Sequence, residues 1–163
     1  MKSSLILSAF MILVSHTSAF ALDSACEPLL SSSAAKIAQP AWHAIHSEGE
    51  AIRIADQSFM KMEGQWMKSP IDLNQVEQQV IDQVKSGAIK VTDCKEAGTE
   101  TLDGKAMRIF TYTTEVLNSG IPAAKAKLYI GKEDGLPYLQ TDVDDKEANQ
   151  VTYRYTGVKA PSL

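Results

Sequence analysis

Histidine, cysteine and acidic side chains are the groups with which this chain could do chemistry, and their spacing restricts that chemistry. His43 and His46 are the only histidines after residue 21. Both fall in a segment that reads as a strand, where residues three apart point to opposite faces. A zinc site needs at least three converging ligands. We therefore expect no metal site at these histidines.

The acidic run at residues 142–147 superficially resembles a calcium-binding loop. Glu147 occupies the place of the required glycine, however, and Tyr153 occupies the place of the bidentate glutamate. No serine stands in a G-x-S-x-G elbow, so the chain shows no nucleophile motif either. We accordingly expect no catalytic residue, no cofactor and no enzymatic activity.

The first residues have the pattern of a secretory signal peptide. Lys2 provides a positive charge, residues 5–14 are nearly all apolar, and residues 19–21 (AFA) form an A-x-A cleavage site. The apolar run is shorter than the roughly 20 residues that a membrane span requires. We expect residues 1–21 to be cleaved, which leaves a single domain at residues 22–163 without a transmembrane segment.

Charge argues against one class of partner. Removal of Lys2 with the leader leaves 15 basic residues against 20 acidic ones, a net charge of −5. The basic residues form no cluster that could neutralise phosphate groups. Nucleic acid is therefore not an expected partner.

Cys26 and Cys94 are the only cysteines, and both lie in the exported part of the chain. An oxidising compartment favours their pairing, so we predict a disulfide. It would close a loop of about seventy residues, which the chain-entropy treatment equates with roughly 4 kcal/mol. One alternative is two separate buried thiols. Another is acylation of Cys26, but Asp23 places a charge where a lipidation signal carries an apolar residue.

Two segments have the composition of helices. Residues 27–38 carry a broad apolar stripe that Pro40 ends. Residues 72–87 begin with Asp72 as a cap, with Gln75 placed to complete a capping box, and end at Gly87. Val76, Val80 and Val84 predict the buried face of this second helix, with Glu77 on the opposite side.

The rest of the chain alternates with period two and predicts an antiparallel sheet. The longest stretch of this kind begins at Gly104, and in it Leu128 and Ile130 share one face while Lys127 and Tyr129 share the other. The expected strands are residues 41–48, 51–55, 58–62, 65–68, 88–94, 99–102, 105–116, 123–130, 137–143 and 150–158.

For one strand, the alternation does not decide which of its two faces is buried. Across residues 105–116, Met107 and Ile109 compete with Phe110 and Tyr112 for the buried side. The order of elements predicts an α+β fold with one large curved sheet of about 10 strands and two main helices. Two helices need not fill the concave side of such a sheet, which allows a cavity for a lipid.

Several short motifs resemble a known group of proteins. They are Gly64-Gln65-Trp66, Ser69-Pro70, Val91-Thr92-Asp93-Cys94, Gly131, Asp134-Gly135-Leu136-Pro137, Val151-Thr152-Tyr153-Arg154-Tyr155 and Val158-Lys159-Ala160-Pro161. Together with the early helix they resemble the lipoprotein-localisation-factor (LolA/LolB-like) superfamily of Gram-negative bacteria, in particular its small periplasmic members.

The resemblance implies an unclosed β-barrel whose concave apolar face is covered by helices and holds acyl chains or a hydrophobic segment of a partner. It also implies a periplasmic location. The chain is shorter than the true carriers. Its predicted cysteine pair would restrict movement of the first helix as a lid.

We predict a non-enzymatic periplasmic protein that binds a lipid, an acyl chain or a lipoprotein in the hollow of its sheet. The alternative is an interaction or regulatory module with a fully packed core, whose partner is an envelope protein. The sequence leaves the oligomeric state open. The residues expected to contact the ligand occupy the apolar positions of the alternating strands, which we expect to share one face of the sheet: Ile52, Ile54, Met60, Met62, Ile109, Leu128 and Ile130.

Overall fold

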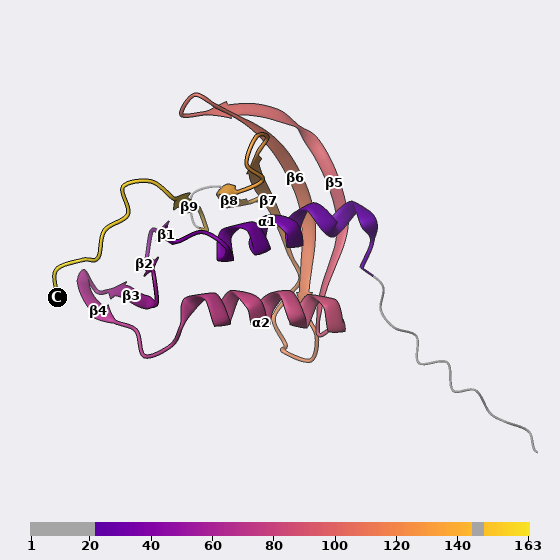
Figure 1. Cartoon of the computed structure of the whole chain (residues 1–163). Coiled ribbons are helices and arrows are strands. Elements are labelled where there is room, and N and C mark those ends of the chain that lie inside the picture. Colours follow the sequence, from indigo (N-terminus) through magenta and orange to yellow (C-terminus); the bar gives the residue numbers. More distant parts are fainter. Residues whose placement is uncertain (1–21, 145–148) are drawn as a thin grey trace, which may run out of the picture.

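The computed structural model describes residues 22–144 and 149–163 (Figure 1). The predicted leader at residues 1–21 lies outside the described residues, as do residues 145–147 of the acidic run. No helix in the described part of the chain is long and apolar enough to cross a membrane.

The described residues form two α-helices and one nine-stranded antiparallel sheet. A short 3₁₀ turn (Ser24–Cys26) leads into α1 (Glu27–Ile37), and α2 (Leu73–Ser86) separates the two strand meanders. The strands are β1 (Ala41–His46), β2 (Gly49–Ile54), β3 (Gln57–Met62), β4 (Gln65–Lys68), β5 (Ile89–Leu102), β6 (Lys105–Val116), β7 (Ala124–Gly131), β8 (Pro137–Asp142) and β9 (Val151–Arg154).

The sheet is curved and does not close. Its strand order is β4-β3-β2-β1-β9-β8-β7-β6-β5, so that β4 and β5 are the two edges. The pairing of β1 with β9, in which Ala44 lies opposite Tyr153, joins the two meanders into one sheet. The β5–β6 hairpin curves around the helices (Figure 1). The predicted α+β unclosed barrel is confirmed.

Both helices cover the same concave face of the sheet (Figure 1). Asn74 at the start of α2 joins this helix to both α1 and the sheet. Its Oδ1 accepts a hydrogen bond of 2.9 Å from Trp42 Nε1 on β1, and its Nδ2 donates one of 3.0 Å to the carbonyl of Ile37 at the end of α1. The indole of Trp42 therefore marks the side of the sheet that faces the helices.

The core lies between the helices and the second meander. Leu128 and Ile130 share the inward face of β7, as predicted, and the pairing of Leu128 with Phe110 places Phe110 beside them. This pairing also decides which face of β6 points inward. Phe110 and Tyr112 face the helices, while Met107 and Ile109 do not. The buried cluster consists of Cys26, Leu29, Val84, Val91, Phe110, Leu128 and Ile130.

The prediction of separate strands at residues 88–94 and 99–102 is wrong. The structure has one long strand, β5, whose pairing with β6 shifts register twice, between Thr92 and Lys95 and between Glu96 and Gly98. Gly98 has a φ of 122°, which an L side chain rarely adopts. These irregularities bend the strand without ending it, so a break in the alternation pattern was mistaken for a turn.

Helix α2 begins and ends as predicted, but the predicted capping box and buried face are wrong in detail. The Asp72 carboxylate accepts a hydrogen bond from the Asn74 amide, and Gly87 ends the helix with a φ of 80°. Val76 is 40% exposed and Val80 is 45% exposed, whereas Glu77 points inward. The physical reason is a buried charge on α1 that Glu77 neutralises.

Candidate functional site

A hollow of about 300 Å³ lies between α1, α2 and the concave face of the sheet. We call this cavity the hollow. Its volume is at the lower end of the range for small-molecule pockets. At ~30 Å³ for a group the size of a water molecule, it accommodates about ten such groups. Most of its wall is apolar, and these apolar residues come from both helices and from β5 and β7: Leu29, Ile81, Val84, Ile89, Val91 and Leu128.

One end of the hollow is polar, and Lys36 of α1 is its central residue. Lys36 is only 3% exposed, and its Nζ lies 2.7 Å from Glu77 Oε1. The same Nζ lies 5.0 Å from the ring centre of Trp42 and 4.7 Å from that of Tyr153. Burial lowers the pKa of Lys36, and the charge and hydrogen bond of Glu77 oppose that shift.

Two tyrosines complete this polar end. Tyr112 of β6 and Tyr153 of β9 line the hollow. Burial raises the pKa of Tyr112 to about 12 and raises the pKa of Tyr153 as well, so both phenols stay protonated at neutral pH. Neither hydroxyl forms a hydrogen bond with another described residue. We call Lys36, Glu77, Tyr112 and Tyr153 the polar end.

The sequence patterns did not predict the polar end. Lys36 follows Leu29 by seven residues, or two helical turns, so both lie on one face of α1. That spacing was a usable sign of a buried lysine. Nothing in the spacing of Glu77, Tyr112 and Tyr153 indicates that they meet Lys36, because they come from three other elements.

The predicted ligand-contact residues do not share one face of the sheet, contrary to the expected parity. Residues that lie opposite each other in neighbouring strands point to the same side. Ile52 pairs with His43, while Arg53 pairs with Trp42 on the helix side. By this register Met60, Met62, Leu128 and Ile130 face the helices, and Ile52, Ile54 and Ile109 face outward.

Only Leu128 of the predicted set lines the hollow. Ile52 and Ile130 are buried elsewhere, and Met62 is exposed. Whether any of these side chains contacts a ligand stays a prediction. On the first meander the residue that occupies the helix side is Arg53, whose Nη1 donates a 3.1 Å hydrogen bond to the Gln39 carbonyl at the end of α1.

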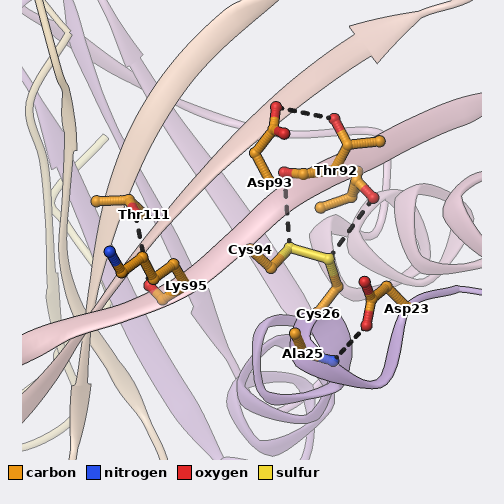
Figure 2. Close-up of a disulfide and its surroundings, with 9 residues drawn as sticks. Asp23, Ala25, Cys26, Thr92, Asp93, Cys94, Lys95 and Thr111 are labelled. Carbon is orange, nitrogen blue, oxygen red and sulfur yellow. Dashed lines mark hydrogen bonds between the residues drawn. A yellow bond between two sulfur atoms is a disulfide. The ribbon is translucent and has the colours of Figure 1, made fainter.

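The predicted disulfide between Cys26 and Cys94 is present (Figure 2). It joins the start of α1 to β5, and Cys26 belongs to the same buried cluster as Leu29 and Val91, which line the hollow. The bond therefore fixes α1 at the apolar end of the hollow. Because the thiol of Cys26 is used in this bond, it is not available for acylation.

The histidines do not converge. The register places His43 on the outward face and His46 on the helix side, as their spacing on a strand predicts. His43 Nε2 lies 2.7 Å from Glu50 Oε2, and Lys61 Nζ lies 2.7 Å from Glu50 Oε1. Within residues 22–144 and 149–163, no group of three or more His, Cys, Asp or Glu side chains could hold a metal ion.

A second cleft, of about 390 Å³, is lined by residues of the strands and their connections, among them Tyr153, which also lines the hollow. Its lining includes Met107, which is 1% exposed, and Tyr138 and Tyr155, whose rings meet edge to face with centres 5.5 Å apart. Lys105 and Arg154 lie at the same cleft. Unlike the hollow, this cleft is not covered by a helix.

Comparisons with known proteins support the fold. No protein-family profile matches the chain, and no curated protein matches its sequence. The solved structure of the lipoprotein LppX from Mycobacterium tuberculosis resembles it with a TM-score of 0.51 and 14% identity, over 83% of this chain and 97% of that one. LprF from Mycobacterium bovis gives a TM-score of 0.45 and 13% identity, over 85% and 96% of the two chains.

The likeness to LppX concerns the fold. It agrees with the architecture described above, a curved, unclosed antiparallel sheet whose concave face is covered by two helices. The chain therefore shares its fold with LppX, and the resemblance to the LolA/LolB-like superfamily is supported at the level of the fold.

Proposed function

We propose that this chain is a non-enzymatic, exported protein of the periplasm that binds an acyl chain, from a lipid or a lipoprotein, in the hollow. Residues 1–21 would be its cleaved leader and residues 22–163 its mature domain. The observation that carries the proposal is the hollow itself, a largely apolar, partly open pocket of about 300 Å³ between two helices and the sheet.

The size of the hollow suits one chain better than two. Each buried methylene contributes about 0.8 kcal/mol, and about ten of them would contribute roughly 8 kcal/mol. Loss of translational and rotational freedom opposes this gain by at least about 4 kcal/mol. A single-chain ligand is therefore expected to bind with modest affinity and to exchange, as a carrier or sensor requires.

A pair of variants on α2 tests this proposal. Val80 lines the hollow and is partly exposed, so Val80→Trp should fill the hollow with little effect on folding. Val76 lies one turn earlier, is similarly exposed and does not line the hollow, which makes Val76→Trp the matched control. Calorimetric titration with monolauroylglycerol should show binding to the wild type and to Val76→Trp, and at least tenfold weaker binding to Val80→Trp.

Native mass spectrometry of the mature protein, purified gently from the periplasm, gives an independent measurement. A stoichiometric co-purifying lipid that denaturing extraction releases would support the proposal. Equal binding of monolauroylglycerol to both tryptophan variants would contradict it, because the hollow would then not be the binding site.

The alternative is an interaction module that works through its surface. Large apolar side chains are exposed on β3, β4 and the loop before α2, namely Met62, Met67 and Ile71. An envelope protein is the partner that this alternative expects. A wild-type chain that binds no acyl probe but retains a protein partner, lost in Met62→Gln/Met67→Gln, would favour this alternative.

A further inference from the structure

The charges at the polar end are balanced before any ligand enters. Lys36 Nζ and Glu77 Oε1 lie 2.7 Å apart, and the rings of Trp42 and Tyr153 flank the cation. A cation held by a carboxylate and two ring faces has its electrostatic partners in place. The polar end therefore offers no unpaired positive charge to a ligand.

A charged head group would be disfavoured there, whichever its sign. Lys36 is 3% exposed, so an unbalanced charge beside its ammonium group is costly, although the Glu77 side chain keeps 30% of its surface exposed. A carboxylate would have to displace Glu77 or lie beside it as a second negative charge. An ammonium group would meet the same difficulty at Lys36.

A neutral group that forms hydrogen bonds meets a different environment. Tyr112 and Tyr153 line the hollow, and their hydroxyls form no hydrogen bond with another described residue. A protonated phenol can donate to an ester carbonyl and accept from a hydroxyl. The side chain of Gln140, which also lines the hollow, can donate and accept as well.

We infer that the hollow selects acyl ligands whose polar end is uncharged, such as an ester or a hydroxyl, and discriminates against free fatty acids. Glu77 determines this specificity because it neutralises Lys36, and the two phenols supply the hydrogen bonds. The inference rests on the proposed function, because it assumes that an acyl chain occupies the apolar part of the hollow.

The test compares two ligands that have the same acyl chain. Monolauroylglycerol carries a neutral head group, and laurate carries a carboxylate that is ionised at neutral pH. Calorimetric titration of the mature protein, below the concentration at which either lipid forms micelles, should show at least tenfold tighter binding of monolauroylglycerol. In Glu77→Gln, which leaves Lys36 without its carboxylate, laurate should bind at least tenfold more tightly than to the wild type.

Two further variants keep the test informative if Glu77→Gln folds poorly. Lys36→Met/Glu77→Leu removes both charges with little change in volume, and it should retain the preference for monolauroylglycerol. Tyr112→Phe/Tyr153→Phe removes only the hydroxyls, so affinity for monolauroylglycerol should fall severalfold. Circular dichroism and an intact disulfide would show that each variant is folded.

The outcomes separate this inference from the proposed function. Equal affinity of the wild type for both lipids, or an unchanged preference in folded Glu77→Gln, would overturn the specificity while leaving acyl binding in place. Binding of neither lipid to the wild type would overturn the proposed function and this inference with it.

Discussion

Three partly buried phenols make the stability of this chain sensitive to alkaline pH. Burial raises the pKa of Tyr112 to about 12, and it also raises the pKa values of Tyr153 and Tyr155. In the unfolded chain these phenols would ionise near their ordinary value of 10.0. The folded chain therefore binds more protons above that pH, and the stabilisation is lost as pH rises toward the folded pKa values.

We predict that the free energy of unfolding falls above a pH of about 10, by up to roughly 1.4 kcal/mol per pH unit for each phenol. The lowered pKa of Lys36 acts in the opposite sense, but one amine opposes three phenols. Urea unfolding at neutral pH and above pH 10 measures the effect. Tyr112→Phe should show a smaller loss, and a stability that does not change across this range would contradict the prediction.

Gly131 on β7 is required by close packing on the outward face. A Cβ at this position would overlap the Asp134 carboxylate and lie 3.0 Å from Cε2 of Tyr138. The Asp134 carboxylate accepts a 2.6 Å hydrogen bond from the Tyr138 hydroxyl, so neither group moves without loss. Gly131→Ala should lower the free energy of unfolding by about 1–3 kcal/mol. Gly120→Ala is a useful comparison, since no atom lies within 4 Å there and only its positive φ costs energy.

At the scale of elements, the start of α2 is held by one side-chain cap and one amide. The Asp72 carboxylate accepts a 2.9 Å hydrogen bond from the Asn74 amide nitrogen, and the Asn74 side chain joins β1 to the end of α1. Loss of the cap leaves a helix N–H without its partner. The cap therefore supports both the helix and the position of Asn74.

We predict that Asp72→Ala lowers the free energy of unfolding by about 1 kcal/mol. Asp82→Ala is the control on the same helix, because the Asp82 carboxylate accepts only an exposed hydrogen bond from Gln78. That control should change stability by less than about 0.5 kcal/mol. Equal effects of the two substitutions in urea unfolding would show that the cap contributes nothing specific.

At the scale of the whole molecule, the disulfide holds α1 over the sheet. Cys26 and Cys94 are separated by 68 residues, and the loop between them contains α1, the first meander and α2. The other end of α1 continues directly into β1, where Arg53 and Asn74 bond to the Gln39 and Ile37 carbonyls. Because both ends are held, we expect α1 to stay in place as a wall of the hollow and not to move as a lid.

We predict that Cys26→Ser/Cys94→Ser loses roughly 4 kcal/mol of stability, because the unfolded chain regains the entropy of that loop. Urea unfolding of the oxidised protein, the reduced protein and the double variant measures this loss. The reduced protein and the double variant should agree. An unchanged unfolding midpoint after complete reduction would mean that the bond does not constrain the unfolded chain.

The sequence by itself determined much of the local structure of this protein. Strand 105–116 was predicted with the bounds that β6 has, Asp72 and Gly87 were recognised as the ends of α2, and two cysteines behind the pattern of a secretory signal predicted the disulfide. The strand and the helix ends depend on residues that are close in the chain. The disulfide could be predicted because each cysteine has only one other cysteine to pair with. Alternation, caps and turn residues act locally, so they can be read without the fold.

Only the tertiary structure decided which faces meet. Alternation shows that Ile52 and Arg53 point to opposite sides, but the pairing of Arg53 with Trp42 places Arg53 under the helices. In the same way, Lys36 and Glu77 lie 41 positions apart in the sequence and meet only because α1 and α2 cover one concave face. A buried ion pair depends on contacts between distant elements, and no local pattern encodes the packing that brings those elements together.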